Sequence, residues 1–159
     1  MFSLILIRIS DIFLSLILIV IFSPIFIILL FTIYFFSGLP IFYISKRIGY
    51  MGREFTFLKF RSIKNNLKEE PTFIGTFIRR ASLDEIPQFF NILLGDMSFV
   101  GPRPLPPELE KQICEKKILK RRSKKPGLTG LSQINYTGKK RTWNDKVILD
   151  LEMINNFNF

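Results

Sequence analysis

The sequence predicts an α+β protein, mostly α-helical, with a membrane-embedded helical segment at residues 1–45 and a small domain containing a short β-hairpin at residues 46–159. Two observations support this prediction. The 34 residues between Asp11 and Lys46 contain no charged side chain, whereas the part from Lys46 onward carries the entire net charge of +10. Within that part, residues 54–60 alternate polar and apolar side chains as a strand does, and longer stretches have helical spacing.

Composition limits the chemistry that this chain can perform. Its 159 residues are enough for one domain with its own core. It contains no histidine, which excludes Ser-His-Asp hydrolysis, Cys-His proteolysis and His-ligated metal sites. The single cysteine, Cys114, excludes an internal disulfide and a multi-cysteine metal site, and we expect it to be buried or interfacial. Any catalysis therefore depends on carboxylates, lysines, arginines or hydroxyls, aided at most by a hard metal ion.

The apolar stretch Ile12–Phe36 shows no polar face, so we interpret it as embedded in lipid. It contains Ser23-Pro24, and because proline removes a backbone donor and clashes with the preceding turn, we expect a kink or break there. The residues leave two arrangements open: a spanning helix with a proline kink, and a re-entrant hairpin that dips into one leaflet. Basic residues from Lys46 onward, with Arg8 before the stretch, favour cytoplasmic flanks on both sides, which only the hairpin allows.

The elements after the membrane segment are predicted from periodicity and turn residues. Gly49 and Gly52 mark the turn of a hairpin. Ser82 and Glu85 fit the Ser-x-x-Glu capping pattern of a helix start, and Gly95 ends that helix. In chain order we expect strands at 40–44 and 54–60, helices at 72–80 and 82–94, an extended segment at 99–107, a helix at 108–125, a strand at 128–135 and a helix at 142–155.

Asp84 and Glu85 are the first candidate site. In one interpretation, which the pair favours in isolation, Glu85 only completes a capping box with Ser82. In the other, one of the two adjacent carboxylates is a nucleophile and the other is a metal ligand. Arg79 and Arg80, a few residues upstream, then bind phosphate. Phosphoryl transfer by an aspartate with Mg²⁺ is chemistry that needs no histidine.

Two basic features follow. Prolines on both sides of Arg103 restrict its backbone and lower the entropy cost of aiming its guanidinium. Taken alone, however, the motif favours an ordinary surface turn with a solvated arginine. Residues 116–125 contain seven basic side chains, a run typical of a solvated face or of non-specific polyanion binding. We expect anionic lipid headgroups as the partner and no nucleic acid, because no recognition motif accompanies the run.

Several segments, in the same order, resemble the bacterial sugar transferases, which are monotopic phosphoglycosyl transferases that act on polyprenyl phosphate. The likeness runs from residue 5 or so to near residue 157, and its two middle motifs are long and almost unbroken. The segments are Ser23-Pro24, Lys59-Phe60-Arg61-Ser62, Arg79 to Gln88, Gly95 to Pro104 and Pro126 to Asn135.

The resemblance implies a function. Family members move a sugar-1-phosphate from a UDP-sugar to undecaprenyl phosphate and release UMP, which is the first membrane step of exopolysaccharide, lipopolysaccharide or glycoprotein glycan assembly. By this match Asp84 is the nucleophile and forms a covalent phosphosugar intermediate. Glu85 is its partner in holding Mg²⁺.

The resemblance also implies further site residues and a location. Lys59, Arg79 and Arg103 fall where the family places basic residues around the phosphates, and Gln133 and Asp150 match other substrate-site positions. The family's membrane segment is a re-entrant helix broken at Ser-Pro, which favours the hairpin. The resemblance also implies that the protein is located at the cytoplasmic face of the bacterial inner membrane. The sugar, the glycan pathway and the oligomeric state are not specified.

The chain departs from the family pattern in three places. Lys125 stands where an arginine commonly precedes Pro-Gly. After Asn135, relatives continue with Gly-Arg-Asn or similar, so the family arginine has no clean counterpart here and one of the basic residues 139–141 is expected to replace it. The chain also ends at Phe159, before the amphipathic helices that usually follow. Two alternatives to an active enzyme therefore stay open: a non-catalytic membrane-anchored module that binds anionic lipid or other polyanions, and an inactive remnant of the family.

Overall fold

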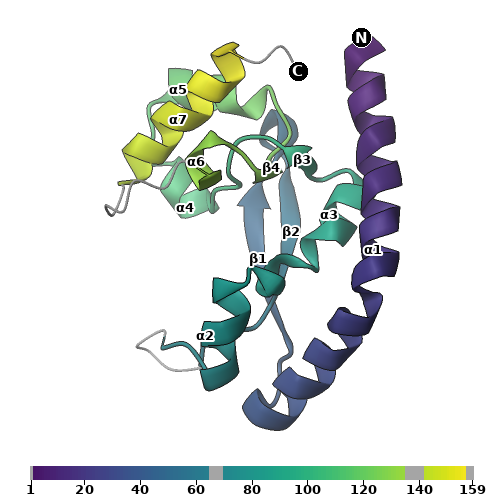
Figure 1. The fold of residues 1–159 in the computed structure, drawn as a ribbon. Coiled ribbons are helices and arrows are strands. Elements are labelled where there is room, and N and C mark those ends of the chain that lie inside the picture. Colours follow the sequence, from purple (N-terminus) through teal and green to yellow (C-terminus); the bar gives the residue numbers. More distant parts are fainter. Residues whose placement is uncertain (1, 65–69, 135–141, 157–159) are drawn as a thin grey trace.

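The computed structural model describes residues 2–64, 70–134 and 142–156 (Figure 1). Their arrangement is mostly helical with two small two-stranded sheets, which confirms the α+β prediction. The helices are α1 (Phe2–Ser37), α2 (Phe73–Arg80), α3 (Gln88–Leu94), α4 (Pro107–Glu110), α5 (Glu115–Arg122), α6 (Leu131–Ile134) and α7 (Trp143–Asn156), with 3₁₀ turns η1 (Tyr50–Gly52) and η2 (Leu83–Glu85). The strands are β1 (Phe42–Ile48), β2 (Glu54–Phe60), β3 (Ser98–Val100) and β4 (Gly127–Thr129).

The expected kink is observed and the expected break is not, because α1 is one continuous helix that contains Ser23-Pro24 and bends without reversing its direction (Figure 1). The re-entrant arrangement in a membrane stays a prediction. The physical reason for the continuous helix lies next to the proline. Pro24 has no N–H to donate to the carbonyl of Val20, one turn earlier. The hydroxyl of Ser23 donates to that carbonyl instead, at 2.8 Å. A side chain thus satisfies the acceptor that the proline leaves free, so the helix can continue through Ser23-Pro24.

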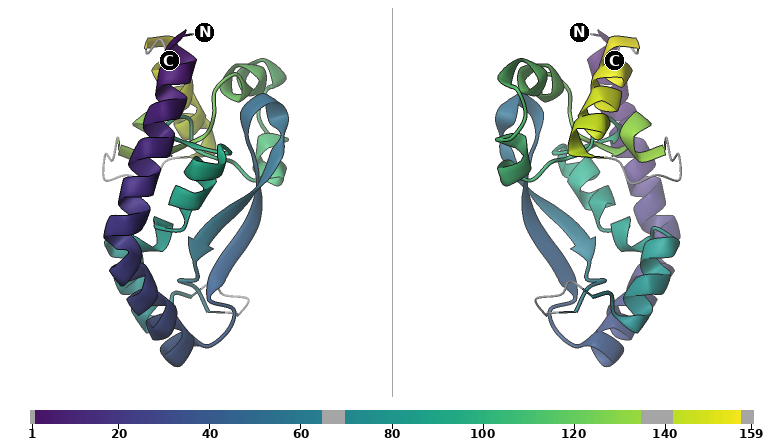
Figure 2. Two further views of the ribbon diagram at one scale, coloured as in Figure 1. Left: turned by 90° about the vertical axis from the view of Figure 1, so that its right-hand side faces the viewer. Right: turned by 90° about the vertical axis from the view of Figure 1, so that its left-hand side faces the viewer.

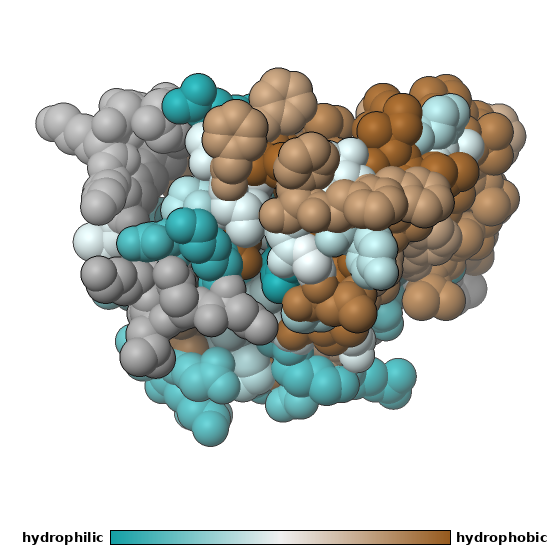
Figure 3. Space-filling model, turned by 90° about the horizontal axis from the view of Figure 1, so that it is seen from below, coloured by the Kyte–Doolittle hydropathy of each residue, from teal (hydrophilic) through white to brown (hydrophobic). Residues whose placement is uncertain are grey.

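The surface of α1 is largely apolar and uncovered. Residues Leu4–Ser37 are long and apolar enough to cross a membrane, and only 11% of the most apolar window is buried against the rest of the protein. A core helix of a soluble protein would be mostly buried. In Figure 3 apolar residues cover one side of the molecule, while hydrophilic residues lie on the opposite side and along one edge.

The two charged residues of α1 attach its N-terminal half to the rest of the domain. The guanidinium of Arg8 donates to the carbonyls of Ile92 and Leu93 at the end of α3, both at 2.7 Å. One carboxylate oxygen of Asp11 accepts from the hydroxyl of Ser98 and from the N–H of Phe99, both at 3.1 Å. We call these contacts the Arg8–Asp11 clasp. They explain why two charges lie within an otherwise apolar helix.

The C-terminal end of α1 is held by a different residue. Arg61, directly after β2, is buried and donates to the carbonyls of Ser37, Gly38 (2.7 Å) and Leu39 (3.0 Å). These carbonyls have no partner within the helix, and a cation suits the negative end of the helix dipole. Both ends of α1 therefore contact the same domain.

The predicted β-hairpin is confirmed. β1 and β2 pair antiparallel, with Phe42 opposite Phe60 and Ile48 opposite Glu54, so the first strand extends four residues beyond the predicted end at residue 44. Gly52 in the connecting turn has φ = 78°, a conformation that favours glycine. Figure 2 shows α3 between the hairpin and α1, and the core between these three elements contains the fully buried Phe60 and Ile92.

The second sheet brings two predicted motifs together. β3 and β4 pair parallel, with Ser98 opposite Gly127. A Cβ atom at Gly127 would lie 2.1 Å from the backbone nitrogen of Gly101, so the glycine permits this close backbone approach. The Gly-Pro-Arg-Pro and Pro-Gly-Leu-Thr-Gly motifs are therefore neighbours in space although they are 25 residues apart.

The remaining elements agree in part with the prediction. The helices at 72–80 and 142–155 are confirmed, and the hydroxyl of Thr72 caps α2 by accepting from the N–H of Gly75 at 2.8 Å. The single helix expected at 108–125 is instead α4 and α5, whose connection buries Ile113. The strand expected at 128–135 ends at Thr129 and is followed by α6. Cys114 is exposed rather than buried.

Candidate active site

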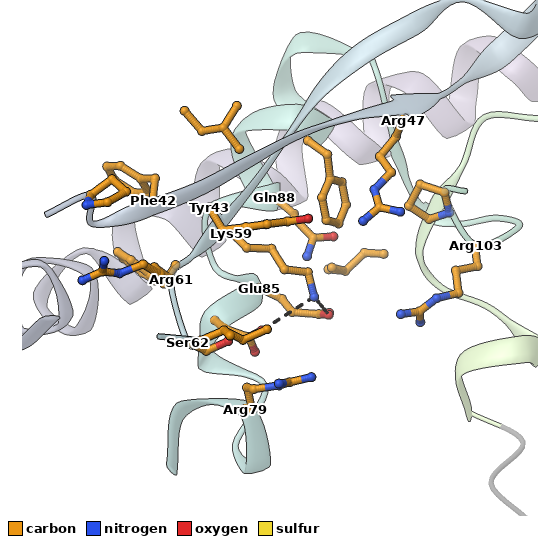
Figure 4. A pocket seen from close by; sticks show the side chains of 18 of the residues that line it. Phe42, Tyr43, Arg47, Lys59, Arg61, Ser62, Arg79, Glu85, Gln88 and Arg103 are labelled. Atoms are coloured by element: carbon orange, nitrogen blue, oxygen red, sulfur yellow. Dashed lines mark hydrogen bonds and ion pairs between the residues drawn. The ribbon is translucent and has the colours of Figure 1, made fainter. Parts of the chain in front are cut away.

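A cavity of about 680 Å³ opens between the β1–β2 hairpin, the α2–α3 region and the segments that follow β3 and β4 (Figure 4). Six basic and two acidic residues line it, so its charge suits an anionic ligand. These charged lining residues are Arg47, Lys59, Arg61, Lys64, Arg79, Asp84, Glu85 and Arg103.

The two adjacent carboxylates lie together at the centre of this charged lining. Asp84, on η2, is buried with 7% of its surface exposed, whereas the side chain of Glu85 is about one-third exposed. Lys59, from β2, hydrogen-bonds to Glu85, and its ammonium lies 3.6 Å from a carboxylate oxygen of Asp84. The predicted pair and the predicted lysine are thus in direct contact, although 24 residues separate them in sequence.

The capping-box interpretation of Ser82 and Glu85 is wrong. Ser82 adopts a left-handed conformation with φ = 54° and its side chain caps nothing. Residues Leu83–Glu85 form a single 3₁₀ turn, and the α-helix begins only after Pro87. Glu85 therefore does not cap Ser82, and both carboxylates remain available to line the cavity.

Burial is the main influence on the nucleophile candidate. It raises the pKa of Asp84 above the ordinary carboxyl value, and the neighbouring charge of Glu85 raises it further. Lys59 and Arg79 act in the opposite direction by favouring the carboxylate. A carboxylate of raised pKa is more basic and so a better nucleophile, and the two cations favour its charged form.

Arg103 reaches the cavity from the segment after β3, and a buried ion pair holds that segment in place. Asp150, with 1% exposed, pairs with Arg121 at 2.9 Å. Arg121 also donates to the carbonyl of Arg103 at 2.6 Å, and Asp150 accepts from the N–H of Arg103 at 3.4 Å. Asp150 itself does not line the cavity. Its place in the structure is behind the site, as a support for Arg103.

The other predicted site residues divide between the cavity and its walls. Arg79 and Gln133 line the cavity. The amide of Gln133 is also used internally, since it donates to the carbonyl of Gly127 at 3.3 Å and accepts from the hydroxyl of Ser132 at 2.7 Å. Ser23 and Pro24 lie in α1, outside the cavity lining. The basic residues 139–141 fall outside the described residues.

The basic run at 116–125 is not one uniform binding face. Arg121 forms the buried pair with Asp150, and Arg122 pairs with Glu110 at 2.7 Å. Lys116, Lys117 and Lys120 are exposed. Part of the charge that we assigned to polyanion binding is therefore used for internal contacts.

Two cavity residues were missed by sequence reasoning. Arg47 lies on β1 with its guanidinium 5.2 Å from the centre of the Phe57 ring, and Gln88 begins α3 with 2% exposed and no partner for its amide nitrogen among the described residues. Both line the cavity. The alternation of β1 could have indicated Arg47, but only with the register of the hairpin known.

The site also has the composition expected of an Mg²⁺ site that is completed by substrate. Among the residues with assigned positions, no three or more carboxylate or cysteine side chains gather in a metal-binding cluster. Asp84 and Glu85 supply two carboxylates, and Mg²⁺ is commonly held by one or two carboxylates together with substrate phosphates. The residues therefore fit the ion only if a phosphorylated ligand contributes the other oxygens.

Comparison with known proteins identifies the class to which this fold and site belong. The family described as "Bacterial sugar transferase" matches residues 2–159. The chain therefore belongs to the bacterial sugar transferase family.

Several relatives are close enough to align over most of the chain. The chain is 39% identical over 132 residues to the uncharacterized sugar transferase EpsL of Bacillus subtilis, covering 77% of this chain and 64% of that protein. It is 34% identical over 155 residues to the exopolysaccharide production protein ExoY of Sinorhizobium fredii, covering 80% and 68%. It is 36% identical over 165 residues to the UDP-glucose:undecaprenyl-phosphate glucose-1-phosphate transferase of Escherichia coli, covering 92% and 35%. The matched part thus spans only about a third to two-thirds of these relatives.

Proposed function

We propose that this protein transfers a sugar-1-phosphate from a UDP-sugar to undecaprenyl phosphate, or a similar polyprenyl phosphate, and releases UMP. The observation that carries the proposal is the contact of Lys59 with the Asp84–Glu85 pair inside a cationic cavity. The relative from Escherichia coli is named for the transfer of glucose-1-phosphate from UDP-glucose to undecaprenyl phosphate. In that reaction both substrates are phosphate esters, which a cavity with six basic residues suits.

The proposed mechanism proceeds in two displacements. A carboxylate oxygen of Asp84 attacks the phosphorus that carries the sugar, and the bond from that phosphorus to the UMP oxygen breaks. An oxygen of the polyprenyl phosphate then attacks the same phosphorus, and its bond to Asp84 breaks, which regenerates the carboxylate. Lys59 and Arg79 stabilise the charge on the transferring group.

We propose that Asp84 and Glu85 hold Mg²⁺ together with the donor phosphates. When bound, the ion would neutralise phosphate charge and so reduce repulsion between the anionic nucleophile and the anionic donor. The two carboxylates supply oxygens, the ligand type that Mg²⁺ prefers, and the partly exposed Glu85 leaves room for a second ligand.

We also propose that α1 enters and leaves one leaflet on the cytoplasmic face of the bacterial inner membrane. The Arg8–Asp11 clasp attaches its first half to the domain, and Arg61 attaches its last residues. A helix that the same small domain holds at both ends cannot place those ends on opposite sides of a bilayer. The acceptor's phosphate would then meet the cavity near headgroup height.

The decisive experiment measures UMP release by the full chain in nanodiscs, with Mg²⁺, undecaprenyl phosphate and a panel of UDP-sugars. We expect UMP from at least one donor, a covalent phosphosugar adduct on Asp84 and no turnover for Asp84→Asn. Glu152→Gln, which removes one exposed carboxylate outside the cavity, serves as the charge-matched control and should keep full activity. Salt-sensitive binding to anionic liposomes that Asp84→Asn leaves unchanged, with no UMP from any donor, would instead identify a non-catalytic polyanion-binding module.

The membrane arrangement has its own test. In a Cys114→Ser background, single cysteines at Ser3→Cys and Lys64→Cys are labelled in oriented vesicles with a reagent that does not cross the bilayer. We expect both to react from the same side. Labelling from opposite sides would exclude a re-entrant α1 and identify a spanning helix.

A further inference from the structure

Two arginines meet in one part of the cavity (Figure 4). In Figure 4 the guanidinium groups of Arg47, from β1, and Arg103, from the segment after β3, point into the cavity on the same side of Glu85. They come from different elements, yet they are close enough to interact. Burial is the largest cause that lowers the pKa of Arg47, and Arg103 lowers it further, whereas Tyr43 and Glu108 act in the opposite direction. Among residues 2–64, 70–134 and 142–156, neither guanidinium forms an ion pair.

The proximity of the two guanidinium groups costs free energy, which a bound anion would offset. Like charges repel, and the Nε atom of Arg47 is buried without a hydrogen-bond partner, although buried polar atoms in native proteins are nearly always paired. The stacking of Arg47 on the ring of Phe57 fixes the direction of its planar fork. Two guanidinium groups that point into the same cavity, one of them held by stacking on Phe57, fit a phosphate, which accepts paired N–H donors from arginine.

We propose that Arg47 and Arg103 form a second phosphate-binding site that holds, in turn, the phosphate of the departing UMP and the phosphate of the lipid acceptor. The inference rests on the proposed function. It assigns Lys59 and Arg79, beside Asp84, to the phosphate that carries the sugar. It assigns the arginine pair to whichever phosphate occupies the opposite side of the reacting phosphorus.

In-line displacement explains why one site serves two ligands. When Asp84 attacks, the bond to UMP that breaks lies opposite the bond that forms, so UMP leaves on the side away from Asp84. In the second step the acceptor oxygen must attack opposite the Asp84–phosphorus bond, which is the position that UMP has just vacated. The same two guanidinium groups therefore neutralise the leaving phosphate first and the attacking phosphate second.

The neighbouring lysine provides a matched control. Lys46 precedes Arg47 on β1, but successive strand residues face opposite sides, and Lys46 is exposed with its ammonium 3.2 Å from the hydroxyl of Thr56. It does not line the cavity. Lys46→Gln and Arg47→Gln thus remove the same charge from adjacent positions, only one of which belongs to the proposed site.

The test measures UMP binding to the full chain in nanodiscs by isothermal titration calorimetry, which needs no turnover. We expect Arg47→Gln to weaken UMP binding at least tenfold and Lys46→Gln to change it less than twofold. Arg47→Lys, which keeps the charge but loses the fork, should give an intermediate loss. A short-chain polyprenyl phosphate should displace UMP from the wild type. Unchanged UMP affinity in Arg47→Gln, or simultaneous binding of both ligands, would overturn the proposal.

Kinetics separates this proposal from the proposed function. In the UMP-release assay, Arg47→Gln should raise KM for both the UDP-sugar and the acceptor, because both use the site. If the wild type turns over and Arg47→Gln leaves either KM unchanged, the shared site is wrong and the reaction stands. If the wild type never turns over but Arg47→Gln still weakens UMP binding, the site stands and the reaction is wrong. Circular dichroism confirms that each variant is folded.

Discussion

Arg121 with Asp150, and Lys59 with Asp84, are both pairs of a basic residue and an aspartate, but their surroundings differ. The first pair is almost completely buried, with 5% and 1% of each residue exposed, and its bonds all go to protein atoms. The second faces the cavity, and its ammonium is 3.6 Å from the aspartate because it is shared with Glu85. We call Arg121–Asp150 the closed pair, because protein surrounds it, and Lys59–Asp84 the open pair, because it faces the cavity. The closed pair stabilises structure, whereas the open pair leaves coordination free for a ligand.

The largest expected effect is on the closed pair. Arg121→Met leaves the charge of Asp150 buried and unpaired, which costs about 3–5 kcal/mol of unfolding free energy. Urea denaturation measures it, with the exposed Lys120→Met as the control on the same helix. The double variant Arg121→Met/Asp150→Leu should recover most of the loss. Failure to recover would mean that the pair does more than neutralise its own charges.

The next effect is on the open pair. In the proposed reaction, Lys59→Met removes a cation beside the phosphate that is transferred, and such losses reduce kcat by about 10²-fold or more. UMP release measures this effect, while the melting temperature should change little compared with Arg121→Met. If Lys59→Met lost stability and activity in parallel, the open pair would have the same structural role as the closed pair.

The third effect has the opposite sign. Because burial raises the pKa of Asp84, the unfolded chain loses this proton at lower pH than the folded protein, so ionisation destabilises the fold as pH rises between those two pKa values. At pH values above the raised pKa, the free energy of unfolding of Asp84→Asn should therefore exceed that of the wild type by about 1 kcal/mol. At pH values below the ordinary carboxyl range, the two should be equal. Urea unfolding with EDTA across this range measures the gain. If the stability difference between Asp84→Asn and the wild type grew as the pH was lowered, burial of the Asp84 carboxylate would not be its cause.

The smallest effect is on a fully open pair. Lys64 and Glu70 are about half exposed at 3.5 Å, and exposed pairs of this kind contribute less than about 1 kcal/mol. Lys64→Gln should change the unfolding free energy within that limit, and added salt should reduce even this. A larger loss of unfolding free energy would mean that the contribution of an ion pair to stability does not decrease with its exposure.

The sequence could not distinguish the two aspartates. Asp84 and Asp150 both matched substrate-site positions, yet only Asp84 lines the cavity, because burial of Asp150 by α5 depends on tertiary packing. Local patterns were reliable where contacts are local, as for α2 with its Thr72 cap. They misled at Ser82, whose backbone is left-handed and is followed by a single 3₁₀ turn, while the α-helix begins only after Pro87.

Long-range pairings set a second limit. The parallel contact of β3 with β4 and the register that turns Arg47 into the cavity join residues with no common local pattern. The sequence left open whether α1 kinks or breaks at Pro24, because the helix continues with the help of one hydroxyl, that of Ser23, and periodicity cannot show which acceptor that hydroxyl chooses. The motifs predicted which residues belong to the site, but the packing decides which of them touch.

The Arg8–Asp11 clasp has a consequence for synthesis of the chain. Its bonds join residues 84 to 88 positions apart, so none can form until the chain has been made as far as Ile92 and Phe99. At translation rates of about 5–20 residues per second, this delay after Arg8 lasts roughly 4–18 s. During that time α1 has no folded domain to pack against. In the membrane arrangement proposed above, α1 can therefore insert into lipid before it docks, and the order of synthesis separates the two events.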